Sequence, residues 1–143
     1  MPDGTVAESA VPHLDEIVQL AAPTEPCLVW LIGGSMHPTL REGDELFVEP
    51  RTGRPRLGDV IVFPYSGRML AHRVIGLESG IVLAAGDASV GQRERVPFDV
   101  IVGIVRSARR HGRTLPRPSS PLRAMLLRLR LAIAYRLRMR TRT

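Results

Sequence analysis

The chain has 143 residues, enough for one domain with a real hydrophobic core. It contains no lysine, which excludes a lysine base, and its single cysteine, Cys27, excludes an internal disulfide and a cysteine-ligated zinc site. Residues 1–105 hold 8 arginines and all 14 acids, whereas residues 106–143 hold 12 arginines and no acid, so we expect a mildly acidic body with a strongly basic tail.

The first expected element is a short helix over residues 12–22 (PHLDEIVQLAA), within an N-terminal segment spanning residues 1–26. Strand candidates rich in valine and isoleucine follow, separated by Gly-Asp turns. They are residues 27–32, 45–49, 59–63, 68–77, 80–85 and 100–106. This pattern predicts a mainly β body of coiled antiparallel sheets over residues 27–106, with short helices confined to the ends. Cys27 begins this body and is expected to be an inert core thiol.

The C-terminal part predicts two further segments. Residues 107–121 (SARRHGRTLPRPSSP) are expected to form a polar linker, and residues 122–143 a separate basic amphipathic tail. Apolar residues alternate from 127 to 139, which is typical of a strand, whereas Leu, Arg, Ala and Met favour a helix. We expect a helix, with its arginines distributed all round the axis.

No segment has the run of about 18 apolar residues that spans a bilayer, and the N-terminus lacks the pattern of a secretory signal. We therefore expect a cytoplasmic protein with neither a signal peptide nor a transmembrane helix. Seven arginines and the seven alternating apolar residues from 127 to 139 share the tail, so we expect peripheral contact with an anionic membrane through residues 122–143.

The stretch GGSMHPTL places Ser35 in a turn directly after an apolar run. A serine hydroxyl becomes a good nucleophile only when a base removes its proton. The available histidines are His13, His37, His72 and His111. His72 is the best candidate, although a single histidine on an apolar strand face is more often a packed structural residue. The other three are expected to lie at the surface.

Three blocks carry a resemblance: GGSMHPTLREGDELFVEP (33–50), RLGDVIVFPYSGRMLAHRVIG (56–76) and AAGDASVGQRERVPFDVIVGIV (84–105). Their order and spacing are similar to those of the type I signal peptidase family of serine endopeptidases. The resemblance implies a signal-peptidase-like fold and cleavage of a peptide or protein substrate after small residues. It implies that Ser35 is the nucleophile. His72 stands where most bacterial members have a lysine, as in the endoplasmic-reticulum, archaeal and sporulation-type branch.

The same resemblance assigns the remaining site residues. Asp87 is the preferred carboxylate to orient His72, with Glu94 as the alternative, and Asp87 is equally well explained as a turn residue. Gly34 and Met36 are expected at the oxyanion hole and substrate cleft. Gly33 replaces a serine that donates to the oxyanion in many bacterial members, which predicts a slow or specialised enzyme. No cofactor and no metal are expected.

Two other readings compete with a serine endopeptidase. A repressor-type autopeptidase needs a lysine base and usually a DNA-binding helix pair, and the sequence predicts neither. The second is an inactive peptidase-like module that binds peptides by strand addition, or anionic surfaces or nucleic acid through its tail. Nucleic acid is disfavoured because the body is acidic and the tail lacks interleaved aromatic residues.

Overall fold

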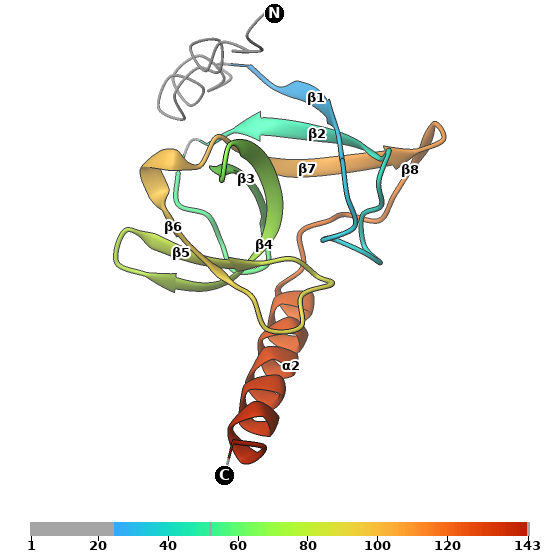
Figure 1. Cartoon of the computed structure of the whole chain (residues 1–143). Helices are drawn as coiled ribbons and strands as arrows, with labels where there is room; N and C mark the ends of the chain where they lie inside the picture. The colour runs from blue at the N-terminus through green and yellow to red at the C-terminus, as the bar shows by residue number, and fades with distance from the viewer. Residues whose placement is uncertain (1–24, 52, 143) are drawn as a thin grey trace, which may run out of the picture.

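The computed structural model describes residues 25–51 and 53–142, so the helix expected over residues 12–22 lies outside the described residues. Within them, eight strands form one antiparallel sheet in the order β1-β2-β7-β3-β4-β5-β6, with β8 paired to β7 (Figure 1). The strands are β1 (Cys27–Trp30), β2 (Glu45–Pro50), β3 (Val60–Tyr65), β4 (Arg68–Glu78), β5 (Ile81–Ala85), β6 (Glu94–Pro97), β7 (Gly103–Arg110) and β8 (Arg113–Thr114). The other elements of the described residues are a 3₁₀ turn, η2 (Phe98–Val100), and a helix, α2 (Pro121–Arg140). The predicted mainly β fold is confirmed.

The sheet coils because its middle strand faces two cores. Along β3, Val60 and Val62 pack into one buried cluster, and Ile61 and Phe63 into the other. Successive side chains of a strand point to opposite faces, so this alternation wraps the sheet around both clusters. All four residues are buried, which explains why the sequence here is a continuous apolar run.

The expected linker over residues 107–121 is in part sheet instead, since residues 107–110 belong to β7 and residues 113–114 form β8. Strand β7 continues to Arg110 because it pairs along β2, with Arg109 opposite Glu45. The side chains of that pair are 3.2 Å apart, which compensates the charges on the strand. Past the following turn, β8 adds to the same strand. The polar composition of the segment therefore marks an exposed sheet edge.

Helix α2 begins at a capped N-terminus and packs on the β body. The Ser120 hydroxyl accepts a hydrogen bond from the Arg123 N–H at 3.2 Å, and Pro121 occupies the first turn. Ala124, Leu127 and Leu131 are buried, in one cluster with Ile75 of β4 and Ala85 of β5. The preference for a helix is confirmed, but the tail is not separate from the body.

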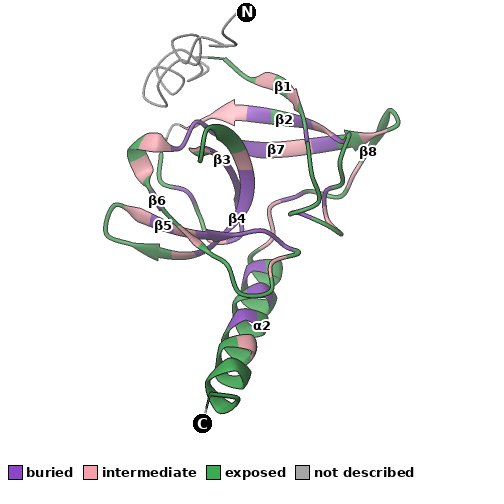
Figure 2. Ribbon diagram, in the orientation of Figure 1, coloured by how far each residue is buried: buried purple, intermediate pink, exposed green. Residues whose placement is uncertain are grey.

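Beyond these contacts the helix projects from the sheet with most of its surface exposed (Figure 2). Gly58 fixes where the helix starts, since its φ is +92° and a Cβ there would overlap the backbone of Ser120 and Pro121. Among the described residues, no helix combines the length and apolar composition needed to cross a bilayer.

Candidate active site

Ser35 lies in the loop 31–44 between β1 and β2, and the two ends of this loop are tied together. The Leu31 N–H donates to the Asp44 carbonyl at 2.9 Å. The Asp44 carboxylate accepts from the Arg41 N–H at 2.8 Å and from the Arg110 Nε at 2.8 Å. Burial acts to raise the pKa of Asp44, but the hydrogen bonds from Arg110 and Arg41 outweigh it and hold this pKa below its ordinary value. The loop therefore presents Ser35, which is exposed, on a fixed base.

The turn after β5 holds Ser35 next to His72. The Ser35 carbonyl accepts a hydrogen bond from the Ala88 N–H at 3.0 Å. A Cβ at Gly86 would overlap that carbonyl oxygen and lie 3.2 Å from His72 Nε2, so only glycine fits between the two residues. Both residues border a hollow of about 390 Å³, the histidine hollow, which Gly86, Glu94 and Arg138 also line. The structure thus brings together the predicted nucleophile and base.

His72 is held with one ring nitrogen paired and the other free. It is 7% exposed on β4, and its Nδ1 lies 2.9 Å from the Glu94 Oε2. A carboxylate only accepts hydrogen bonds, so Nδ1 carries the proton and Nε2 carries the lone pair in the neutral ring. Nε2 is buried and has no hydrogen-bond partner among the described residues, Ser35 included. The imidazole is therefore arranged to take a proton at Nε2.

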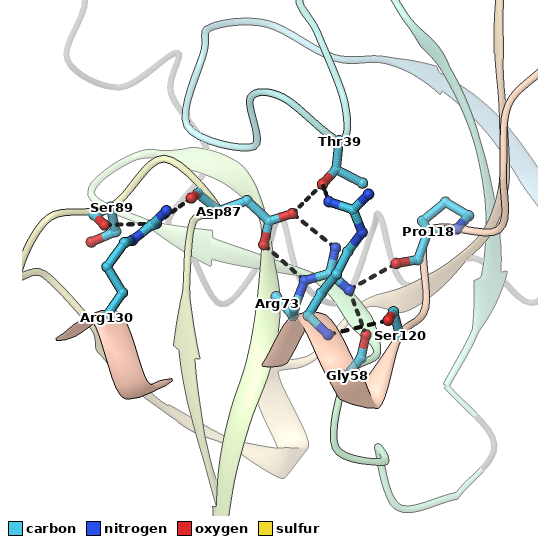
Figure 3. Close-up of polar contacts among 9 residues, drawn as sticks. Thr39, Gly58, Arg73, Asp87, Ser89, Pro118, Ser120 and Arg130 are labelled. Atoms are coloured by element: carbon cyan, nitrogen blue, oxygen red, sulfur yellow. Dashed lines mark hydrogen bonds and ion pairs between the residues drawn. The ribbon is translucent and has the colours of Figure 1, made fainter. Parts of the chain in front are cut away.

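Asp87 does not make the contact that the sequence favoured for it. Its Oδ1 accepts from Arg73 Nε at 2.8 Å, and its Oδ2 accepts from Arg73 Nη2 at 2.8 Å and Thr39 Oγ1 at 2.6 Å (Figure 3). Both carboxylate oxygens are thus engaged away from the imidazole. The preference for Asp87 over Glu94 is corrected, because Glu94 holds the Nδ1 of His72.

Asp87 instead ties together the segments that carry the site. Arg73 is fully buried, and its Nη1 donates to the carbonyls of Gly58 at 2.9 Å and Pro118 at 2.7 Å. Sequence reasoning missed this role. The available signal was an arginine within an apolar strand candidate (68–77), because an arginine buried there requires an anionic partner.

Helix α2 contributes to the same network. Arg130 Nη2 donates to the carbonyls of Asp87 and Ser89, the latter at 2.9 Å, and Arg123 Nη1 donates to Thr39 Oγ1 at 2.9 Å (Figure 3). The helix therefore supports both the Ser35 loop and the turn behind His72. Sequence reasoning missed these two arginines as well.

Gly34 and Met36 flank Ser35 in different ways. Gly34 lies in the exposed loop, and no atom lies within 4 Å of a Cβ placed on it. The Ser35 N–H donates to no protein acceptor among the described residues, so it is free to stabilise an oxyanion. Met36 is fully buried in the core and lines neither hollow beside Ser35. Its expected place in the cleft is therefore corrected.

Of the other histidines, His37 and His111 are exposed turn residues, as expected, and His13 lies outside the described residues. Cys27 is half-buried, and it packs against the core and lines the hollow described next. Within residues 25–51 and 53–142, no group of three or more His, Cys, Asp or Glu side chains is placed to hold a metal ion.

A second hollow, of about 410 Å³, is also lined by Ser35 but not by His72, and is called the apolar hollow. It is formed by β1, the residues that follow it, and the start of β4. Its walls include Trp30, Ile32, Met69, Leu70 and Ala71. Strand β1 is at the edge of the described sheet, so one side of its backbone has no strand partner among residues 25–51 and 53–142. The arrangement can receive an extended apolar chain next to the serine.

Parts of this sequence are similar to those of known proteins. The model of the Peptidase S24-like family matches residues 3–105, which leaves α2 outside the match. The chain is 33% identical over 66 residues to the signal peptidase complex catalytic subunit of Lodderomyces elongisporus, covering 42% of this chain and 40% of that protein. It is 30% identical over 76 residues to the subunit of the same name from Clavispora lusitaniae, covering 49% and 46%. The chain thus spans less than half the length of these relatives. No solved structure matches.

Proposed function

The chain belongs to the Peptidase S24-like family, and we propose that it is a serine endopeptidase of signal-peptidase type. In this proposal Ser35 is the nucleophile, His72 the general base, and Glu94 the residue that positions His72. One observation carries the proposal above the others. The buried Nε2 of His72 has no hydrogen-bond partner in the described part of the chain and lies beside Ser35, while Nδ1 is held by a carboxylate.

The proposed reaction uses these atoms in two steps. Ser35 Oγ attacks the substrate carbonyl as its proton passes to Nε2 of His72, and Glu94 stabilises the imidazolium. The Ser35 N–H binds the oxyanion of the tetrahedral intermediate. The C–N bond then breaks as Nε2 returns the proton to the leaving amine. Water, deprotonated by the same nitrogen, hydrolyses the acyl-serine and restores the enzyme.

The proposed substrate is an extended segment of a peptide or protein. Its backbone pairs with the open edge of β1, and its side chains before the scissile bond enter the apolar hollow. The relatives are named as catalytic subunits of a signal peptidase complex. In line with the resemblance of the sequence to type I signal peptidases, we assign small residues to the position just before the bond and to the one two positions earlier.

The experiment is digestion of a peptide library by the wild-type protein, read by mass spectrometry. We expect products from the wild type and none from Ser35→Ala or His72→Ala, with all three proteins equally folded by circular dichroism. His37→Ala is the matched control, since this histidine is near Ser35 in sequence but exposed in a turn. Loss of activity in His37→Ala with retention in His72→Ala would overturn the assignment of the base. Peptide binding without any cleavage would favour the inactive binding module.

The proposed site of action is an anionic membrane surface, contacted through α2. At 100° per residue, Leu122, Leu126, Leu129, Ile133 and Leu137 lie within about 80° of one another around the helix axis. Each is at least half exposed, and the stripe faces roughly opposite to the buried residues of the helix. The helix contains no acidic residue, so its arginines repel a second copy and attract anionic lipid.

Membrane contact is tested by co-sedimentation with vesicles of anionic or neutral lipid at low and high salt. We expect wild-type binding to anionic vesicles only, and loss of that binding in the Leu129→Ser/Ile133→Ser variant. A matched control, Val90→Ser, removes an exposed apolar side chain elsewhere. Equal recovery of all three proteins in the supernatant would rule out this contact, and stronger binding to DNA or RNA would replace it.

A further inference from the structure

The histidine hollow continues into another hollow along α2. This hollow along α2 has a volume of about 340 Å³ and lies between the loop 86–93 and the helix. The two share Val90, Gly91 and Arg138 in their walls. The Arg138 guanidinium lies against the loop, since a Cβ on Gly91 would be 2.9 Å from its Nη1. A chain leaving Ser35 through the histidine hollow therefore passes this guanidinium.

The hollow along α2, called the arginine hollow, is lined by charged side chains that are all positive. Arg93, Arg128, Arg136 and Arg138 line it, and no Asp or Glu does. The guanidinium groups of these four arginines form no ion pair and no hydrogen bond with another described residue. Elsewhere in the described chain arginines do find carboxylates, as Arg110 does with Asp44. Four uncompensated positive charges around one concave surface attract an anionic group.

The position of His72 tells which end of the substrate enters these hollows. His72 Nε2 delivers the proton to the leaving amine, so the part of the substrate after the scissile bond lies on the side of His72. The histidine hollow is lined by both Ser35 and His72, whereas the apolar hollow is lined by Ser35 but not by His72. The residues that follow the scissile bond therefore extend toward Arg138.

The size of the histidine hollow gives the number of substrate residues between the scissile bond and the arginine hollow. Its volume of about 390 Å³ corresponds to a width of about 9 Å, which an extended chain crosses in about three residues. We propose that this enzyme selects protein substrates with acidic side chains at about the third to sixth residues after the scissile bond, bound by the arginine hollow. This specificity rests on the proposed endopeptidase function.

The test compares peptides that are identical up to the scissile bond and carry Glu, Gln or Arg at the third to sixth positions after it. One exposed charge pair contributes up to about fivefold in affinity, so several pairs predict a preference of at least about tenfold for Glu over Gln in kcat/KM. The preference should shrink in Arg138→Gln, shrink further in Arg138→Glu, and decrease with added salt. Arg113→Gln is the control, because Arg113 is exposed on β8 and lines none of the three hollows.

A second readout separates this specificity from the activity itself. Fluorescent versions of the same peptides are titrated against Ser35→Ala, which retains the hollows but cannot turn over. Tighter binding of the Glu peptide that depends on Arg138 supports the specificity even if no peptide is cleaved, whereas the absence of cleavage by wild type counts against the endopeptidase. Equal affinity for Glu and Gln peptides overturns the specificity. Tighter binding of an oligonucleotide or of anionic vesicles than of the Glu peptide, again dependent on Arg138, also overturns it.

Discussion

Two conservative substitutions, Glu94→Gln and Asp87→Asn, should separate the carboxylate that positions the base from the one that holds the structure. Glutamine preserves the shape of Glu94 but loses its charge. Only one orientation of the amide accepts the Nδ1 proton of His72, and the other orientation favours the tautomer that cannot act as a base. By comparison with Ser-His-Asp enzymes, we expect kcat to fall about 10²- to 10⁴-fold.

The same change should have little effect on stability. The Glu94 side chain is 12% exposed on an edge strand of the described sheet, and its hydrogen-bond partner is Nδ1 of His72. A hydrogen bond of this kind contributes about 1 kcal/mol. For a chain of this size, we expect a decrease in Tm of only a few degrees.

Asp87→Asn should show the opposite balance. Arg73 is 0% exposed, and Asp87 accepts from two of its nitrogens, so the amide leaves a buried guanidinium without a counter-charge. Breaking a buried pair in this way costs about 3–5 kcal/mol of unfolding free energy. We expect a decrease in Tm of about 10 °C or more, with activity lost in proportion to unfolding.

The assay measures Tm by circular dichroism and kcat/KM on the same preparation of each variant. Arg95→Gln is a control for charge loss, because its ion pair with Glu78 is exposed. The two roles are contradicted if Asp87→Asn keeps the wild-type Tm but loses activity while Glu94→Gln retains activity. That outcome would return the orienting role to Asp87.

Three further predictions concern the loop that carries Ser35. Gly86→Ala should reduce activity at least about tenfold, because its methyl group pushes the Ser35 carbonyl away from the turn; unchanged kcat/KM would contradict this contact. The pKa of Asp44 is lowered in the folded state from its ordinary value of 3.8. The carboxylate therefore stabilises the fold fully above pH 3.8, and this stabilisation is lost as the pH falls through the folded pKa. Unfolding in urea should therefore show wild type losing more stability than Asp44→Asn between pH 7 and pH 3, and parallel curves would disprove it. Gly33→Ser should lower Tm without raising kcat, because φ is +84° there, and a gain in kcat would show that an added hydroxyl reaches the oxyanion.

The sheet was predictable from the sequence because its inner strands are continuous apolar runs between Gly-Asp turns. The strands that were missed, β6 and β8, are short and largely exposed, so their sequences carry no apolar pattern. They form because neighbouring strands offer open edges. Helix α2 was expected from the propensity of its residues, but its docking depends on Ala124, Leu127 and Leu131, and their pattern is obscured by the apolar stripe on the outer face.

At the site, the sequence predicted Ser35 and His72 but did not identify Glu94 as the carboxylate that contacts His72. Asp87 and Glu94 are both near the turn that faces Ser35, and spacing alone does not distinguish them. The choice depends on Arg73, whose burial in β4 draws Asp87 away from the imidazole. The pairing of Asp87 with Arg73 depends on three-dimensional packing, which cannot be inferred from the order of the residues.

The most direct test of the central claim is labelling with a serine-directed fluorophosphonate, read by intact mass and by peptide mapping. Our account predicts one addition, at Ser35, in the folded wild-type protein. It also predicts labelling slowed at least about 100-fold in His72→Ala and absent in Ser35→Ala. Failure to label Ser35, or equally fast labelling in His72→Ala, would contradict the claim that Ser35 and His72 form a nucleophile–base pair.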